Sequence, residues 1–583
     1  MNPELLLNHF NRISDALDAI PRLRAFILDL AVRGKLVEQD PKDEPASELL
    51  ARIQREKARL VKSGVIRPGK PLAEVEDCDL FQLPKGWAWT RWEAIALKIG
   101  DIDHKMPETV AEGVPFVSPR DFLPGNRIDF DGAKRISFED FARLSAKTRP
   151  AIGDLIYPRY GTIGENRLAT DERDFLVSYS CAVIKVLVGF IDAKYQYFYS
   201  VSSFCRGQAK AAENKTTQAN VGIKSIQEFV VPLPPLPEQH RIVAKVDELM
   251  ALCDRVEAMR AETESHRDRL AAASLHHLNN GANAEVLRVH ANFYVSHLPC
   301  FTTRPNQLKE LRRTILNLAV RGRLVNQDPN DEPASQLLRR VNTERGRLAK
   351  EGKVPQQKPL PPIEETTVPF SLPNGWSWAR LGSLCRLVTS GSRDWAKFYS
   401  NEGAIFLRMG NLSRDSYQLR LHNIQRVKPP ADSEGARTKL QQGDILISIT
   451  GEVGLLGLIP NDFEESYINQ HTCLVRPMDE LRHRYLPELF RSPFAQNQFD
   501  EPQRGLKNSF RLTDVTHFLV PLPPLAEQHR IVAKVDELMV LCGRLETELA
   551  MVQDDGSRLL DAVLHDALNN NQGDMDKLSA AQA

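Results

Sequence analysis

The sequence predicts an α+β protein in which two mixed α/β domains are separated by long antiparallel coiled-coil helices, with a pseudo-twofold internal repeat. Three observations predict this fold class. Three segments occur twice, 288 or 289 residues apart, which is about half of the 583 residues. One repeated segment has the spacing of a long amphipathic helix, and the sequence between the repeats has diverged. The repeated pairs are 23–53 with 311–341, 81–89 with 370–378, and 231–253 with 520–542.

The third pair is nearly identical, because only two of its 23 positions differ. A repeat of this length exceeds a solenoid unit and indicates duplication of a whole module. A frame copied so strictly suggests one shared mechanical role. The diverged inserts suggest two separate recognition roles.

The long helices are predicted from the residues after each VPLPPL run. Apolar residues there alternate steps of four and three, as a two-helix seam requires. Each helix should continue for about 40 residues to an asparagine-rich stop, giving a rod of about 60 Å. We expect the seam to mediate coiled-coil pairing and partner docking. Its residues are Ile242, Val246, Leu249, Cys253 and Val256 in the first copy, and Ile531, Val535, Leu538, Cys542 and Leu545 in the second.

Such helices need packing partners. The segments 23–32 and 311–320 are predicted to be apolar helices, each followed by a turn and an N-cap serine, Ser47 or Ser335, for a further helix. The simplest assembly pairs the two long helices antiparallel. The alternative is that each long helix packs only on its own domain.

The two inserts, residues 87–235 and 376–524, retain a faint alignment. Strands are expected where β-branched and aromatic residues gather, with tight turns at the glycine pairs. Each insert should therefore be a mixed α/β domain with a shared scaffold and different loops. The aligned pairs are 153–164 with 443–454, and Phe116-Val117 with Phe406-Leu407.

Composition limits the class of protein. No run of apolar residues is long enough for a membrane span, the first residues lack a secretory signal, and eight cysteines form no CxxC pair. These features favour a reduced, cytoplasmic protein. The 76 basic and 76 acidic residues cancel, whereas a stand-alone DNA-binding protein usually has a basic excess. DNA binding would therefore need help from a partner.

Catalytic signatures are missing. The sequence has no HExxH, GxSxG, GxxxxGK[ST] or zinc-type Cys/His pattern, and no Asn/Asp-Pro-Pro-Tyr/Phe box. Glu213-Asn214-Lys215 has the E-x-K form of many nucleases but lacks an acidic partner upstream. His276 and His277 are adjacent, so they point to different helix faces. We predict no catalytic residue and no metal ligand.

Candidate DNA-binding residues are polar side chains in loops at equivalent places of the two inserts, because such groups match base edges and phosphates. An ordinary solvated loop is the alternative interpretation. The candidates are Arg120, Arg159, Thr162, Lys215, Thr216, Thr217, Gln218 and Asn220 in the first insert, and Arg408, Asn411, Thr450, Arg504, Lys507, Asn508, Ser509 and Arg511 in the second.

Three motifs occur in the same order in both halves: Leu-Ala-Val-Arg-Gly at 30–34 and 318–322, LPxGW at 83–87 and 372–376, and PLPPLxEQxxIV at 232–243 and 521–532. With these motifs, the chain resembles the specificity subunit of a type I restriction–modification system. The resemblance covers nearly the whole chain, and the ordered combination of motifs is highly specific.

The resemblance implies two target recognition domains, each reading one half of a bipartite, asymmetric DNA site. It implies a coiled-coil spacer that docks two modification (methyltransferase) subunits, and an association with restriction subunits in host defence. This chain would be non-catalytic and bind no cofactor. S-adenosylmethionine would belong to the modification subunits, which methylate adenine, and ATP and magnesium to the restriction subunits.

Domain boundaries follow from the repeats. We expect helical conserved regions at 1–80 and 307–369, recognition domains at 81–236 and 370–525, long helices at 237–280 and 526–571, a connector at 281–306 and a flexible tail at 572–583. Two other functions compete with DNA recognition. One is a coiled-coil scaffold that joins two other ligand-binding domains, and the other is an enzyme with an unrecognised site in the inserts.

Overall fold

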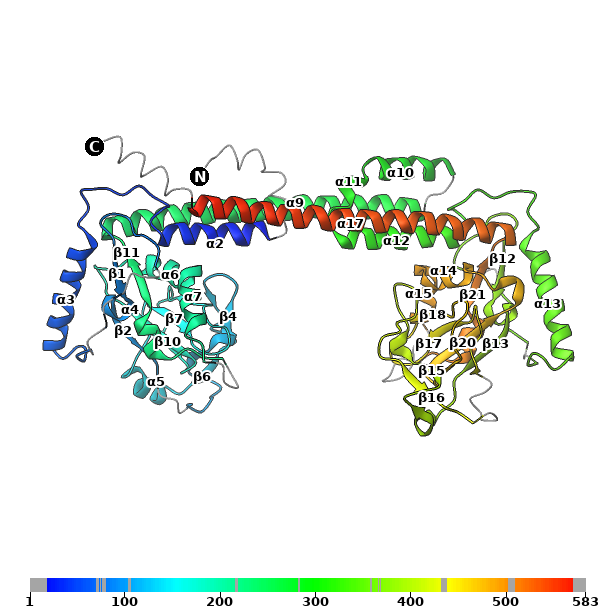
Figure 1. Cartoon of the computed structure of the whole chain (residues 1–583), viewed down its shortest axis with the longest axis horizontal. Coiled ribbons are helices and arrows are strands. Elements are labelled where there is room, and N and C mark those ends of the chain that lie inside the picture. Colours follow the sequence, from blue (N-terminus) through cyan, green and yellow to red (C-terminus); the bar gives the residue numbers. More distant parts are fainter. Residues whose placement is uncertain are drawn as a thin grey trace. The chain divides into compact units, whose positions relative to one another are not determined.

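The structure is a computed structural model that describes most of the chain (Figure 1). The described residues are 18–69, 73, 75, 80–102, 106–214, 219–280, 284–356, 359–364, 366, 368–430, 438–501 and 509–569. They divide into two compact units. The first comprises Met1–Glu262 with Val552–Ala583, and the second comprises Thr263–Met551. Among the described helices, none combines the length and apolarity needed to cross a membrane.

The first unit contains a four-stranded antiparallel sheet, β2-β10-β7-β8, and a three-stranded sheet, β6-β3-β9, in which β3 and β9 are parallel. The strands are β2 (Ala96–Gly100), β3 (Val114–Val117), β6 (Lys134–Ile136), β7 (Leu155–Pro158), β8 (Arg167–Leu168), β9 (Leu176–Val177) and β10 (Cys181–Val186). Short strands β4 (Phe122–Leu123) and β5 (Arg127–Ile128) pair separately.

Strand β10 lies between two apolar layers. Successive side chains of a strand point to opposite faces, so Cys181 and Val183 pack with Val117 and Val177 of the smaller sheet. Ala182, Ile184 and Val186 instead join the core beneath the helices. Those helices are α4 (Trp92–Ile95), α6 (Ala193–Val201), α7 (Ser203–Ala211) and α8 (Ile223–Glu228), with α5 (Phe138–Ser145) outside this core.

The second unit repeats this scaffold. Its antiparallel sheet β13-β20-β17-β18 matches the first, and its sheet β14-β16-β15-β19 again contains a parallel pair, β15 with β19. The shared scaffold predicted from the faint alignment is therefore confirmed. The strands are β13 (Cys385–Ser390), β14 (Tyr399–Ser400), β15 (Ala404–Leu407), β16 (Gln425–Val427), β17 (Ile445–Ser448), β18 (Leu456–Leu458), β19 (Ser466–Ile468) and β20 (Thr472–Pro477), and the helices are α14 (Tyr485–Arg491), α15 (Pro493–Asp500) and α16 (Leu512–His517).

The repeated motifs meet in each unit. The strand after LPxGW pairs antiparallel with the VPLPPL strand: β1 (Ala88–Arg91) with β11 (Val230–Leu233), and β12 (Ser377–Arg380) with β21 (Leu519–Leu522). We call the residues around each pair the junction. The first junction is Gly34, Gln39, Trp87, Glu238 and Gln239, and the second is Gly322, Gln327, Trp376, Glu527 and Gln528.

Hydrogen bonds at the junction explain the strict copying of its residues. Gln39 donates to Gly34 O at 2.8 Å and to Glu238 Oε1 at 3.1 Å. Gln327 donates to Gly322 O at 2.7 Å and to Glu527 Oε1 at 3.0 Å. Burial raises the pKa of both glutamates, although the glutamine hydrogen bonds oppose that rise. A buried polar group that loses its partner is destabilising, so substitution here is costly.

The helices after each turn are α3 (Ala46–Lys62) and α13 (Ala334–Lys350), and they begin two residues before the expected position. The prediction that Ser47 and Ser335 are N-caps is therefore wrong. The first amide of each helix is buried and donates to a distant backbone carbonyl instead. Ala46 N donates to Gly86 O and Ala334 N donates to Gly375 O, both at 2.8 Å, and these glycines belong to LPxGW.

The two long helices are α9 (Leu236–Asn280) and α17 (Leu525–Asn569), and each contains 45 residues. The described residues of both helices reach the predicted asparagine-rich stops. The predicted apolar helices are also present, as α2 (Ala19–Val32) and α12 (Pro305–Val320). The expected connector contains helices α10 (Ala284–Ser296) and α11 (Leu298–Phe301), where the sequence pattern was weak.

The seam residues of the first half of each long helix pack inside their own unit. Ile242, Val246 and Cys253 are buried against α2 and α6, and Leu249 and Val256 border that cluster. Their counterparts in α17 behave alike: Ile531, Val535 and Cys542 are buried in the cluster that contains α12, Leu538 borders it, and Leu545 is half-buried. For these halves, the predicted partner segments 23–32 and 311–320 cover the seam, together with residues of the helix's own domain as in the alternative.

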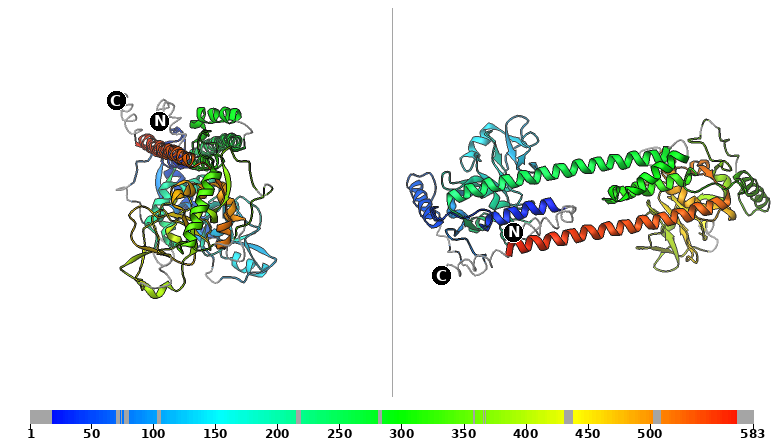
Figure 2. Two further views of the ribbon diagram at one scale, coloured as in Figure 1. Left: turned by 90° about the vertical axis from the view of Figure 1, so that its right-hand side faces the viewer. Right: turned by 90° about the horizontal axis from the view of Figure 1, so that it is seen from above.

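The frame helices also contact the far end of the other long helix. Figure 2 shows α2 between α9 and α17, where Ala19 packs on Leu560 and Val563 of α17. In the second unit, α12 contacts α17 through Arg312 and Glu546 at 2.6 Å. It contacts the end of α9 through hydrogen bonds between Asn317 and Asn279 at 2.8 Å. The same three-helix arrangement therefore occurs in both units.

Candidate nucleic-acid interface

Each domain has a pocket where the ends of its two sheets meet. In the first domain, the end of β3, the turn after β7 and the turn between β9 and β10 enclose about 450 Å³. We call this the first pocket. Its lining residues are Met106, Phe116, Ser118, Pro119, Arg120, Lys134, Tyr160, Gly161, Thr162, Ser178, Tyr179 and Ser180.

The second domain has a pocket at the equivalent place, formed by the end of β15, the turn after β17 and the turn between β19 and β20. It encloses about 710 Å³, and we call it the second pocket. Its lining residues are Arg408, Met409, Gly410, Asn411, His422, Asn423, Thr450, Gly451, Asn469, His471 and Ser509.

Six of the predicted DNA-binding residues line these pockets. Arg120 and Thr162 line the first pocket, and Arg408, Asn411, Thr450 and Ser509 line the second. Asn220 pairs through its backbone with Tyr160, and Arg511 immediately precedes α16. Seven predicted residues lie outside the described residues: Lys215, Thr216, Thr217, Gln218, Arg504, Lys507 and Asn508.

Arg159 and Asn411 hold the pocket walls. Arg159 is buried, forms an ion pair with Asp101 and donates through Nε to Val221 O at 3.2 Å. Asn411 is also buried and accepts a hydrogen bond from Arg408 N at 3.0 Å. These contacts position the turns. Arg120, whose side chain is 59% exposed, remains open to solvent.

Several lining residues that can stack on bases or donate to them were not among the predicted DNA-binding residues. Tyr160 and Tyr179 line the first pocket with their rings 6.1 Å apart. In the second pocket, Thr450 Oγ1 lies 2.6 Å from His471 Nδ1, and Gln470 Nε2 lies 3.0 Å from His471 Nε2. Tyr160 could have been predicted from the sequence, because it directly precedes the aligned Gly161.

The pockets differ from the chain as a whole in their charge. The chain has zero net charge, yet none of the described lining residues of either pocket is Asp or Glu. Arginine, lysine, histidine, hydroxyl and amide groups line them instead. Such groups match the negative charge of phosphates and the edges of bases. Among the described residues, no group of acids, histidines and cysteines could hold a metal ion.

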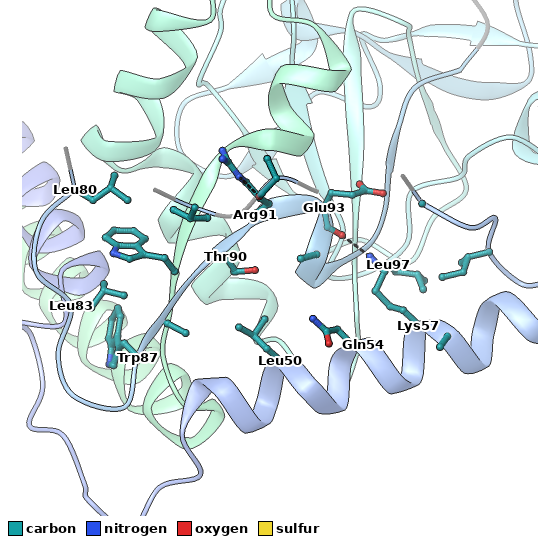
Figure 3. Close-up of a pocket in the computed structure, with 18 of the residues that line it drawn as sticks. Leu50, Gln54, Lys57, Leu80, Leu83, Trp87, Thr90, Arg91, Glu93 and Leu97 are labelled. Carbon is teal, nitrogen blue, oxygen red and sulfur yellow. Dashed lines mark hydrogen bonds between the residues drawn. The ribbon is translucent and has the colours of Figure 1, made fainter. Parts of the chain in front are cut away.

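A larger cavity of about 1220 Å³ lies elsewhere in the first unit, between α3 and the strand β1 (Figure 3). Lys57 of α3 crosses it and donates to Glu93 O at 2.5 Å and to Ala96 O at 2.9 Å. The second unit has a similar tie, from Arg345 Nε of α13 to Cys385 O at 3.0 Å. This duplicated contact holds the frame helix to the domain, so we assign the cavity to the frame.

Comparison with known proteins identifies the class. The family described as the type I restriction modification DNA specificity domain matches residues 93–263 and 373–550. The chain is 32% identical to the EcoAI specificity subunit of Escherichia coli and 31% identical to the EcoEI specificity subunit of the same species. Each alignment covers 94% of this chain and 94% of the relative.

The chain belongs to the family of type I restriction–modification DNA specificity subunits. It is therefore a non-catalytic subunit, as predicted. A solved structure, the HsdS subunit from Thermoanaerobacter tengcongensis, aligns over 84% of this chain and 99% of its own at 20% identity, with a TM-score of 0.40.

Proposed function

We propose that this chain reads a bipartite, asymmetric duplex DNA site, with one half-site contacted by each pocket. The observation that carries the proposal is the presence of acid-free pockets at equivalent places in two domains whose lining side chains differ. Equivalent placement suits two half-sites on one duplex, and different linings suit different base sequences. Zero net charge fits a chain that shares phosphate contacts with partner subunits.

The proposal includes docking of two modification subunits on an exposed surface of the long helices. This surface lies on the side opposite the buried seam and occurs in both copies. We call it the helix patch. It consists of Ala244, Lys245, Glu248, Ala251 and Leu252 in α9, and of Ala533, Lys534, Glu537, Val540 and Leu541 in α17.

Four of the five positions in the helix patch are identical between the copies, although folding does not require this. Leu252 and Leu541 are 47% and 44% exposed. The pair Lys245–Glu248 at 3.0 Å is an exposed ion pair, and such pairs contribute at most about 1 kcal/mol. The near-identical run ends after Cys253, where Asp254 is aligned with Gly543 of the other copy. One partner that binds twice would preserve this surface.

The partner that fits the helix patch is a protein. An exposed glutamate repels phosphate, and an exposed leucine favours an apolar surface. Two copies of the patch fit two copies of one subunit, which in this proposal is the methyltransferase. S-adenosylmethionine would then bind to the modification subunits, and ATP and magnesium to restriction subunits. This chain would bind none of them.

We further propose that α9 and α17 form an antiparallel spacer between the half-sites. Each of these helices begins in one unit and ends in the other. A continuous helix transmits a fixed rise of 1.5 Å per residue. The number of residues in the spacer would then set the number of base pairs between the half-sites.

The direct test measures binding by the chain in complex with its modification subunits. A library of duplexes should yield a bipartite consensus, and equal affinity for every duplex would contradict the proposal. Arg408→Ala should weaken binding to the selected site by about 10- to 100-fold, the usual worth of a base-reading arginine. Arg426→Ala is the matched control, because Arg426 pairs with Glu464 outside the pocket and should bind like the unmodified chain.

A further inference from the structure

The two pockets present side chains from equivalent backbone positions. Ser118 and Arg408 each precede a short 3-10 turn at the end of β3 or β15. Their backbone angles agree, with φ −131° and ψ 169° for Ser118, and φ −122° and ψ 169° for Arg408. The following residues, Pro119-Arg120 and Met409-Gly410, therefore occupy matching places in the two domains.

The other two walls match through their backbone hydrogen bonds. Arg159 N donates to Ser180 O at 2.8 Å, and Ile449 N donates to His471 O at 2.9 Å. Ser180 and His471 are thus equivalent in space, although their spacing from the repeats differs by one residue.

The turns that carry Tyr160 and Thr450 are also alike. The next residue is a glycine in both domains, and Gly161 and Gly451 share a φ of 73°. Tyr160 forms a backbone bridge with Asn220, as Thr450 does with Ser509. Both glycines line their pockets and are unchanged between the domains, because the left-handed conformation disfavours any other residue.

Six positions therefore line both pockets from the same backbone with different side chains. One pair, Ser178/Asn469, is held within its turn, because Ser178 is buried and Asn469 Oδ1 accepts hydrogen bonds from His471 N and Thr472 Oγ1, which leaves five pairs for recognition. The difference is chemical rather than architectural, since sheet order and hydrogen bonds are conserved around them. The five pairs are Ser118/Arg408, Pro119/Met409, Arg120/Gly410, Tyr160/Thr450 and Ser180/His471.

We propose that these five positions, which we call the specificity set, determine which bases each domain reads. This inference rests on the proposed function, in which each domain reads one half-site. Each pocket contains one arginine at its 3-10 turn, Arg408 in the second domain and Arg120 in the first. Arg120 occupies the place of Gly410, which is two positions after the place of Arg408. A guanidinium selects guanine by donating to its O6 and N7. The two domains should therefore prefer guanine at different places in their half-sites.

The remaining pairs change the recognition chemistry further. Tyr160 offers a ring and a hydroxyl, whereas Thr450 is engaged with His471 at 2.6 Å. Within the described residues, Arg408 has no ion-pair partner, while Arg120 lies 3.6 Å from Asp121. The N–H donors of the Arg408 guanidinium are therefore available to bind DNA.

The test exchanges the specificity set without moving the backbone. The first domain receives Ser118→Arg, Pro119→Met, Arg120→Gly, Tyr160→Thr and Ser180→His in the full chain, assembled with modification subunits. The probe is a duplex library randomised in the first half-site only. The preferred first half-site should shift toward the sequence that the second domain selects, with enrichment ratios changing about 10-fold or more. The second half-site should not change.

The control exchanges exposed residues of the same domain that lie outside the pocket. Ile152 and Val188 are 55% and 80% exposed, and Ile152→Gln with Val188→Asp installs the second domain's residues there. This variant should keep the original consensus. The reciprocal exchange in the second domain provides a second variant in case the first does not fold. Its substitutions are Arg408→Ser, Met409→Pro, Gly410→Arg, Thr450→Tyr and His471→Ser. The unfolding temperature of each variant is measured against that of the unmodified chain to show that the variant is folded.

An unchanged first half-site in the folded variant overturns the inference and places specificity elsewhere in the domain. That outcome leaves the proposed function intact, because the unmodified chain still selects a bipartite site. If the unmodified chain selected no site, the proposed function itself would fail. Loss or replacement of the first half-site consensus, with the second retained, supports the specificity set.

Discussion

Gly322 shows how a single residue holds the frame together. Its φ is +64°, and an added Cβ would lie 2.5 Å from Pro373 Cγ and 2.9 Å from Trp376 Cζ2. Gly322→Ala should lower the free energy of unfolding by about 2–4 kcal/mol, through backbone strain and overpacking. Denaturant unfolding of the full chain measures the loss.

The control substitution should change the free energy of unfolding in the opposite direction. Gly346 lies inside α13, and an added Cβ there would meet nothing within 4 Å. Gly346→Ala should stabilise the chain by about 0.5–1 kcal/mol, because alanine favours a helix interior. Equal effects of the two substitutions would contradict the role assigned to Gly322.

His483 makes the stability of the second unit depend on pH. Burial, and secondarily the nearby His529, lowers the pKa of His483 from 6.5 to about 4. Between these pH values the unfolded chain binds more protons than the folded chain, so stability falls as the pH falls. The loss from pH 7 to pH 5 should be about 2 kcal/mol. His483→Gln should flatten this slope in thermal unfolding.

The exposed His266 of α9 provides the comparison for that experiment. His266→Gln removes a histidine of the same unit and tests whether the flattening is specific to His483. The window ends at pH 5 because ordinary carboxyl groups titrate below it. A His483→Gln variant with an unchanged slope would show that burial of this imidazole does not govern the dependence.

For the two pockets, the sequence predicted residues whose side-chain type is typical of DNA contacts. It did not predict residues that line a pocket only because the fold places them there. Arg408 was predicted because it is polar and follows the aligned Phe406-Leu407, and Thr450 because it is polar and precedes the aligned Gly451. His471 was missed because no motif surrounds it and a one-residue shift separates it from its counterpart, Ser180. The pocket unites turns some 20 to 60 residues apart in the chain, and only the strand register brings them together.

At the scale of elements, periodicity predicted the long helices, since a heptad pattern depends on local spacing. It left the packing partner open among the repeated apolar helices, the other long helix and the helix's own domain. The seam of α9 is covered by α2 and α6, and an apolar stripe of one helix is satisfied by any complementary surface. The helix starts were misplaced for a related reason, because Gly86 and Gly375 supply the capping carbonyls from distant parts of the chain.

The helix patch gives the prediction that belongs to this scale. Leu252→Glu or Leu541→Glu should reduce the number of modification subunits bound per chain from two to one, and the double variant should bind none. A charge buried at a protein interface without a partner is strongly unfavourable. Native mass spectrometry of the assembled complex counts the subunits.

Met259→Glu is the matched control for the docking experiment. Met259 is 68% exposed on α9, and the equivalent residue of α17 is already Glu548. This variant should bind two modification subunits. If the double leucine variant also bound two, docking would have to use a different surface.

For the whole molecule, the spacer predicts how the recognised DNA responds to helix length. Seven residues inserted after Glu262 in α9 and after Met551 in α17 would add about 10 Å while nearly preserving the helix faces. The gap between the half-sites should lengthen by about three base pairs, at 3.4 Å each. Selection from duplexes with variable gaps measures this. An unchanged gap in an intact complex would exclude the spacer role.

The repeated frame and the diverged inserts differ in how strictly their residues are copied between the two halves of the chain. Residues that meet at the junction or form the helix patch are nearly the same in both copies, whereas the pocket linings differ. We therefore expect assembly and specificity to be separable, so that one domain should be replaceable without affecting the other.

The most direct test replaces residues 87–231 with the equivalent insert of another member of the family. Adenine methylation is then mapped across a genome in cells that contain the modification subunits. One half-site should change, while the other half-site and the gap should remain the same. A change in both half-sites, or in the gap, would contradict the separation of specificity from assembly.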